Sequence, residues 1–123
     1  MYIVAVHNDP EFKDLWEQNM QEPWESYGDV DMFAVIDGNL IVGGFAVYDD
    51  ESDGIKGTFC SGWTRRHTKV PIEAILQQLV RNVGDVYFKT RRRAAKILLE
   101  KIAKKVKNTD RFGYYIIRGN KNG

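Results

Sequence analysis

The stretch FAVIDGNLIVG, residues 33–43, decides the fold of this chain. Two runs of apolar and β-branched residues flank the triplet Asp37-Gly38-Asn39. Glycine and asparagine accept the positive φ that a tight hairpin turn requires. The pattern therefore predicts a strand over 32–36, a turn, and a return strand over 40–48. A third strand over 55–63 extends the meander, and the glycines inside these strands indicate bulges or close backbone contacts.

Upstream of the meander, the sequence predicts a strand and then a helix. Residues 2–6 are rich in β-forming residues. Asp9 has the side chain of an N-cap, and Pro10 suits the first helical position that follows it. Glu22-Pro23 ends the helix, because a residue that precedes proline is disfavoured in the α region. One apolar stripe follows at helical spacing: Phe12, Leu15, Trp16 and Met20.

Downstream of the meander, the apolar period changes from that of strands to that of helices. Pro71 opens a helix with a strong apolar stripe, and Gly84 stops it. The segment 85–89 reads as a short strand. Residues 91–107 form an amphipathic pattern that predicts one long helix. A final strand is predicted over 112–117.

The expected order is therefore β-α-β-β-β-α-β-α-β. This order predicts an α+β fold with a mixed central sheet, an antiparallel meander and helices on both faces. With 123 residues, we expect one domain over 1–123. No apolar run approaches the ~20 residues of a membrane helix, and the apolar start is too short for a signal peptide. The single cysteine, Cys60, fits the reducing cytoplasm.

Charge is sorted by position along the chain. Residues 1–60 contain 13 acidic and 2 basic residues, whereas residues 61–123 contain 4 acidic and 16 basic residues. The formal net charge of +1 therefore hides an acidic half and a basic half. If each half has its own face of the fold, one surface attracts phosphate-rich ligands and another attracts amines or cations. Opposed charged faces also allow head-to-tail self-association.

Two basic clusters are candidate anion sites. The segment 65–69, RRHTK, lies between a predicted strand and a helix N-terminus, where it is either a phosphate clamp or a solvated loop. Arg91, Arg92 and Arg93 open the last predicted helix, where cations oppose the helix dipole. This placement indicates an anion nearby, which belongs either to the acidic half of the chain or to a partner. Lys96 continues the basic face, either as a solvated surface or as a nucleic-acid-binding surface.

The run 33–43 and the element order resemble the GNAT acyltransferases, the Gcn5-related N-acetyltransferase superfamily, which includes small phage-encoded proteins. The resemblance implies transfer of an acyl group from acetyl-CoA to an amine or basic peptide. It assigns the cofactor thioester to the backbone N–H groups of Phe59, Cys60 and Ser61 or their neighbours. By the same resemblance, the cofactor phosphates are assigned to three cations: Arg65, Arg66 and Lys69. The acceptor amine would lose its proton to a carboxylate such as Glu25 or Asp31, or to water.

Two departures from the family pattern support a second hypothesis. The family places a glycine-rich loop before the helix that binds the cofactor pyrophosphate, but residues 64–71, TRRHTKVP, contain no glycine. The family also often has a tyrosine on the last helix, and residues 91–107 contain none. The alternative is a non-catalytic binding or assembly module of phage type, in the host cytoplasm or a virion. Its basic half would contact nucleic acid or an acidic protein surface.

The remaining candidate residues carry simpler interpretations. The acidic and aromatic connection 22–31 either forms an amine-binding pocket or only keeps the chain soluble. Cys60 lies inside a predicted strand, so we expect a buried and inert thiol. The two histidines and the cysteine lack the spacing of a metal site, so no metal is expected.

Overall fold

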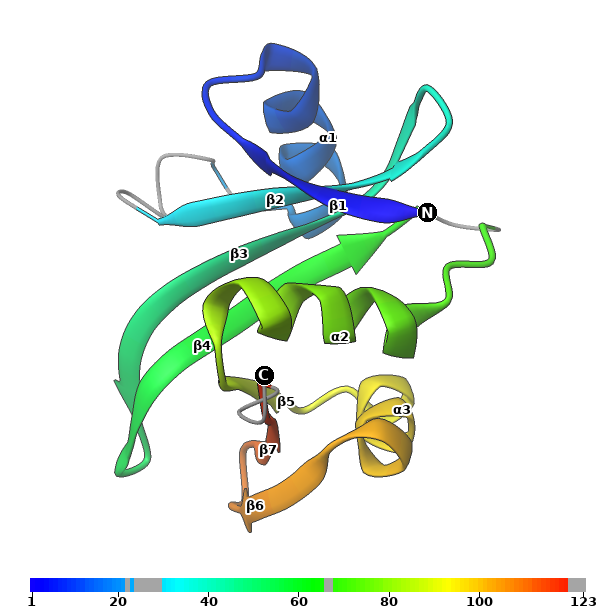
Figure 1. The fold of residues 1–123 in the computed structure, drawn as a ribbon. Coiled ribbons are helices and arrows are strands. Elements are labelled where there is room, and N and C mark those ends of the chain that lie inside the picture. The colour runs from blue at the N-terminus through cyan, green and yellow to red at the C-terminus, as the bar shows by residue number, and fades with distance from the viewer. Residues whose placement is uncertain (22, 24–29, 66–67, 120–123) are drawn as a thin grey trace.

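The computed structural model describes residues 1–21, 23, 30–65 and 68–119 (Figure 1). One seven-stranded sheet runs through the molecule in the order β1-β2-β3-β4-β5-β7-β6. The strands are β1 (Tyr2–Val6), β2 (Asp31–Asp37), β3 (Leu40–Ser52), β4 (Ile55–Thr64), β5 (Val86–Thr90), β6 (Lys104–Asn108) and β7 (Gly113–Ile117). The helices are α1 (Pro10–Met20), α2 (Ile72–Val83) and α3 (Arg93–Ile102). Every strand pair is antiparallel except β4 and β5, which are parallel.

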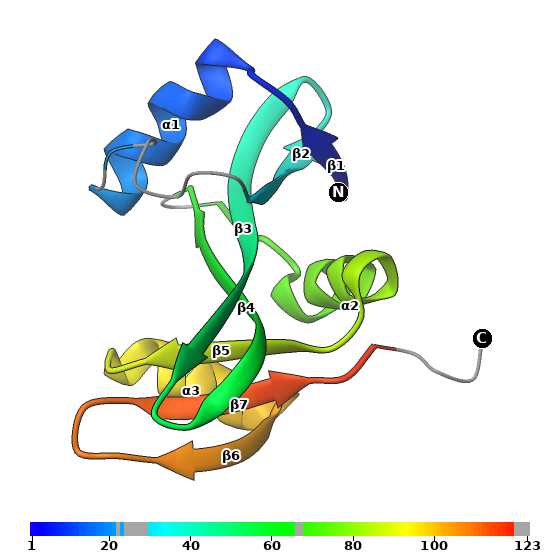
Figure 2. The ribbon, with the colours of Figure 1, turned by 90° about the vertical axis from the view of Figure 1, so that its left-hand side faces the viewer.

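Helices cover both faces of the sheet, as the sequence predicted. Phe12 and Trp16 of α1 pack on one face, which we call the α1 face, against side chains such as Met32 and Ala46. The apolar stripe of α2 packs on the other face, the α2 face. Ile102 of α3 joins that second cluster, so α2 and α3 share one face. Figure 2 shows α1 and α2 on opposite sides of β3 and β4.

The predicted start of α1 is confirmed in detail. The side chain of Asp9 accepts a hydrogen bond from the backbone N–H of Phe12 at 3.1 Å, and Pro10 is the first helical residue. The helix ends where Gln21 adopts a left-handed conformation, with φ of 57°. Because the N-terminal turn is capped and the apolar stripe is buried, the local sequence and the packing specify the same helix.

The prediction of one helix over 91–107 is wrong at its C-terminal end. The helix ends at Ile102, and Lys104–Asn108 form the edge strand β6, which pairs with β7. Lysine tolerates either conformation, and Val106 continues the apolar helical spacing by coincidence, since its side chain is 45% exposed. Pairing with β7 satisfies backbone groups that a longer helix would have bonded internally, and local propensity cannot reveal this competition.

The end of the β3–β4 hairpin bends over β5 and β7 (Figure 2). Tyr114 of β7 is fully buried there, with its hydroxyl 2.6 Å from the hydroxyl of Ser52 and donating to the carboxylate of Asp53. Lys107 donates to the backbone carbonyl of Asp53 at 2.6 Å. These bonds fasten the hairpin to the C-terminal strands. No helix among the described residues is long and apolar enough to cross a membrane.

Gly57 of β4 leaves room for the ring of Tyr87 on β5. A Cβ on Gly57 would lie 2.8 Å from the ring of Tyr87, closer than ordinary packing allows. We expect Gly57→Ala to lower the free energy of unfolding by about 1–3 kcal/mol through overpacking. Urea unfolding measures this change. Lys56→Ala, at the exposed neighbouring position, is the control and should change stability by less than about 0.5 kcal/mol. A Gly57→Ala protein as stable as the wild type would contradict this packing.

Stability should fall at alkaline pH. Burial and donation to Asp53 raise the pKa of Tyr114, and burial and donation to Glu100 raise the pKa of Tyr115. The unfolded chain therefore loses these protons near pH ~10, the ordinary tyrosine pKa, while the native state keeps them. Hence the free energy of unfolding is highest below that pH and declines above it.

Urea titrations between neutral pH and pH ~11 measure this decline. Tyr114→Phe should flatten it, and Tyr2→Phe, at an exposed position, is the control. Equal slopes for wild type and Tyr114→Phe would contradict the assignment.

Candidate functional site: the opening between β4 and β5

The parallel strands β4 and β5 separate shortly after they meet. In the described chain, one register pair joins them, Phe59 with Tyr87. Beyond Phe59, β4 continues along β3 as far as Thr64, whereas β5 pairs with β7 on its other side. The two strands therefore diverge toward their C-terminal ends, as Figure 2 shows. Backbone groups that a regular parallel sheet would bond to each other face this opening instead.

The three β4 residues named from the sequence lie at this divergence. Phe59 is buried, and its ring packs on that of Tyr87 with the centroids 5.4 Å apart. Cys60 is buried on the α2 face, and burial raises the pKa of its thiol, so the thiol is neutral and inert at physiological pH. Ser61 points to the α1 face, where its hydroxyl lies 2.8 Å from the hydroxyl of Tyr48.

Cations follow both diverging strands. Because β4 and β5 are parallel, Arg65 and Arg91–Arg93 follow strand ends that point to the same end of the sheet. The exposed Arg65 donates from its guanidinium to the carbonyl of Ile41 at 3.2 Å. No salt bridge joins Arg65 or Arg91–Arg93 to a described carboxylate. The same holds for Lys69, which is exposed, and for Lys96, which is half-buried. Arg66 lies outside the described residues. Within the described part of the chain, the acidic half therefore does not neutralise the cations.

The two helices that follow the diverging strands begin without side-chain caps. Pro71 precedes α2 and Arg92 precedes α3, and neither makes a capping bond. By contrast, Asp9 caps α1. The first N–H groups of α2 and α3 thus have no capping side chain, and each helix start carries a partial positive charge. Uncapped helix starts and cations without a described carboxylate partner favour an anionic ligand.

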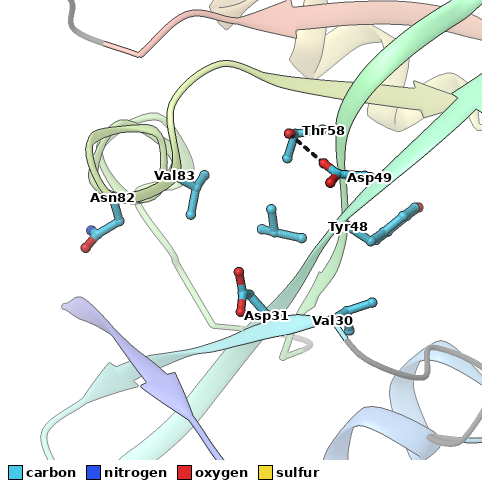
Figure 3. A pocket seen from close by; sticks show the side chains of 8 residues that line it. Val30, Asp31, Tyr48, Asp49, Thr58, Asn82 and Val83 are labelled. Carbon is cyan, nitrogen blue, oxygen red and sulfur yellow. Dashed lines mark hydrogen bonds between the residues drawn. The ribbon is translucent and has the colours of Figure 1, made fainter.

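The sequence analysis named two carboxylates as candidate proton acceptors, and the structure describes one of them. Glu25 lies outside the described residues. Asp31 points into a cleft of about 320 Å³ on the α2 face, between the last turn of α2 and strands β2, β3 and β4 (Figure 3). Asp49 lines the same cleft and accepts a hydrogen bond from Thr58 at 3.1 Å. Two carboxylates near a helix C-terminus make this cleft electronegative.

The strand register places Asp31 in the same row across the sheet as Cys60, next to the point where β4 and β5 separate. Asp31 pairs with Val47, and Val47 pairs with Cys60, so two strand spacings separate Asp31 from β4. Its carboxylate lies on the α2 face, opposite to the side chain of Ser61. From the sequence, only the backbone N–H of Ser61 was assigned a role, and Tyr48 was not a candidate. The available signal was the alternation of strand residues, which puts Tyr48 and Ser61 on one face once β3 and β4 are paired.

Comparison with known proteins identifies the fold. The chain matches no model of a known protein family and no curated protein. Among solved structures, it is similar to the N-acetyltransferase PseH of Campylobacter jejuni in complex with acetyl coenzyme A, with a TM-score of 0.64 and 10% identity over 96% of this chain and 99% of PseH. The chain has a GNAT-like fold.

A second solved structure agrees with this assignment. A probable acetyltransferase of Staphylococcus epidermidis superposes with a TM-score of 0.64 and 10% identity, over 96% of this chain and 98% of its own. The GNAT-like fold therefore extends over 96% of this chain at 10% sequence identity. The likeness concerns the fold, whereas the chemistry depends on the residues that this chain places at the opening.

Proposed function

We propose that this chain is an N-acyltransferase that takes an acyl group from acetyl-CoA and gives it to an amine. The observation that carries the proposal is the opening between β4 and β5. Cations without a described carboxylate partner follow both strands, and the two helices that begin there have no side-chain caps. The similar PseH was solved with acetyl coenzyme A, which supports the same donor for this chain.

The residues at the opening fit a CoA-type ligand despite the absence of a glycine loop. Arg65 and Lys69 would bind phosphate oxygens through side-chain charge, as would Arg66, and the first N–H groups of α2 would donate to the same group. Pro71 contributes no N–H, so side chains take a larger share than in a glycine-rich loop. Backbone N–H groups at Phe59, Cys60 and their neighbours would orient the acyl carbonyl. When bound, acetyl-CoA supplies the activated acyl group.

The acidic half of the chain supports an amine or basic peptide as the acceptor. Asp31 and Asp49 are described carboxylates near the divergence, and Glu25 belongs to the acidic connection that precedes β2. Negative potential around the sheet would raise the local concentration of an ammonium group. The sequence analysis named Glu25 and Asp31 as acceptors of the amine proton, and in this proposal their charge also draws the acceptor toward the sheet.

Calorimetric titration with acetyl-CoA tests the donor. We expect binding by the wild-type chain and a weakening of about 10- to 100-fold in Arg65→Ala or Lys69→Ala, because one charge-assisted contact contributes about 1.5–3 kcal/mol. Arg81→Ala is the matched control, since Arg81 is an exposed cation near the other end of α2. No heat with millimolar acetyl-CoA, or equal losses in all three variants, would contradict this site.

A binding module remains the alternative function. The observation that favours it is the basic segment of α3 and β6, where Arg91, Arg92, Arg93 and Lys96 have no described carboxylate partner. Such a surface would contact the phosphates of a nucleic acid or an acidic protein.

Binding of duplex DNA and of single-stranded RNA at several salt concentrations tests the nucleic-acid version. Phosphate contacts predict a log–log slope of about −0.7 to −0.9 per contact, reduced by about one contact in Arg92→Ala. A flat salt dependence would exclude it.

A further inference from the structure

The α1 face carries a pair of hydroxyl groups at the divergence of β4 and β5. Tyr48 of β3 and Ser61 of β4 lie on this face, with their hydroxyl oxygens 2.8 Å apart and partly buried. Tyr48 also packs against the apolar cluster around α1. The two residues sit diagonally across the strand pair, because Tyr48 pairs with Phe59, two positions before Ser61. Each hydroxyl can therefore both donate to and accept from the other.

The register puts this pair at the edge of the opening. Tyr48, Phe59 and Tyr87 form one row across β3, β4 and β5, and the last two are the register pair that joins the parallel strands. Ser61 is the next residue of β4 on the same face, so it is the first α1-face side chain beyond the junction. Its hydroxyl thus lies beside the backbone segment assigned to the acyl carbonyl.

The two faces have different roles in the proposed reaction. The helices α2 and α3, with their uncapped starts, lie on the α2 face, so the phosphates of the donor would bind on that side. Its thioester would lie in the opening itself, which side chains of the α1 face border. The acceptor amine would then reach the acyl carbon from the α1 face. Asp31 points to the α2 face, and Asp50, on the α1 face, lies 4.0 Å from the ammonium of Lys89. The ring of Tyr87 shares the α1 face but lies against Gly57, before the junction. Of these described groups, the hydroxyl pair is the proton-transferring group best placed for the amine.

We propose that Ser61 and Tyr48 form a relay that moves one proton from the acceptor nitrogen to the donor sulfur, an inference that rests on the proposed N-acyltransferase function. Overall, a C–N bond forms, the C–S bond breaks, one proton leaves nitrogen and one reaches sulfur. Ser61 Oγ accepts the proton from nitrogen and passes its own proton to Tyr48 Oη through the hydrogen bond between them. Tyr48 Oη donates its proton to sulfur. The relay ends neutral and needs no further reactant. It takes the place of the tyrosine that α3 lacks.

Steady-state kinetics with acetyl-CoA and hydroxylamine, a small nucleophile that needs no dedicated pocket, test the relay. Release of the CoA thiol is measured after subtraction of the uncatalysed rate. Tyr48→Phe and Ser61→Ala should each lower kcat by about 100-fold or more, and the double variant should lose little more, because the pair acts as a unit. Ser61→Thr should retain most of kcat. Tyr2→Phe, at an edge position 51% exposed, should match the wild type.

A second measurement does not depend on turnover. The ultraviolet absorbance of bound CoA reports the ionisation of its thiol. A hydrogen bond from Tyr48 stabilises the thiolate, so Tyr48→Phe should raise the pKa of the bound thiol by about 1 unit. Calorimetry should give an affinity for CoA within about twofold of the wild type, since the relay does not bind phosphate.

The outcomes separate the relay from the function on which it rests. A wild-type chain that binds no acetyl-CoA overturns both. A wild type that turns over, with Tyr48→Phe and Ser61→Ala retaining full kcat and an unchanged thiol pKa, overturns only the relay and leaves a structural hydrogen bond between two strands. Loss of kcat with an unshifted thiol pKa also overturns it, because Tyr48 would then not donate to sulfur.

Discussion

The junction of β4 and β5 is the constraint on which the rest of the molecule depends. One parallel register pair, Phe59 with Tyr87, joins an antiparallel N-terminal part of the sheet to an antiparallel C-terminal part. Because the meander bends over β5 and β7 and is fastened there through Tyr114, the two parts remain attached although the strands diverge. An opening in the middle of a sheet is costly for unpaired backbone groups. A ligand that bonds to those groups would offset this cost, which is why the opening is the natural site for chemistry.

The electrostatic arrangement follows from the same junction. Parallel strands send their C-terminal ends to one end of the sheet, so Arg65 and Arg91–Arg93, far apart in the sequence, follow the two strands that border the opening. The helices that begin there have no side-chain caps, whereas α1, away from the opening, is capped by Asp9. A capped helix start is stable by itself, and an uncapped one is stabilised by an anion. The distribution of caps therefore agrees with the distribution of charge.

Much of the fold could be predicted from sequence patterns because local and tertiary forces agree there. Gly38 has the positive φ of the predicted turn, and Asp9 caps α1 as predicted. The apolar stripe of α2 is buried against the sheet, also as predicted. The segment after Ile102 could not be predicted in this way. Its lysines tolerate helix or strand, and pairing with the distant β7 decides between them. Among the candidate site residues, Phe59, Cys60 and Ser61 were named through a family resemblance, but Tyr48 required the register of β3 against β4.

By itself, the sequence determined the periodicity of each element, the separation of acidic from basic residues, and the absence of a glycine loop before α2, because these are local properties of the chain. Only the tertiary structure decided how the candidate residues are arranged: that cations from two segments follow the strands that border the opening, that Asp31 and Ser61 lie on opposite faces, and that Tyr48 meets Ser61. The physical reason is that strand pairing alternates side chains between faces. A shift of one residue in register would move Asp31, Tyr48 or Ser61 to the other face of the sheet.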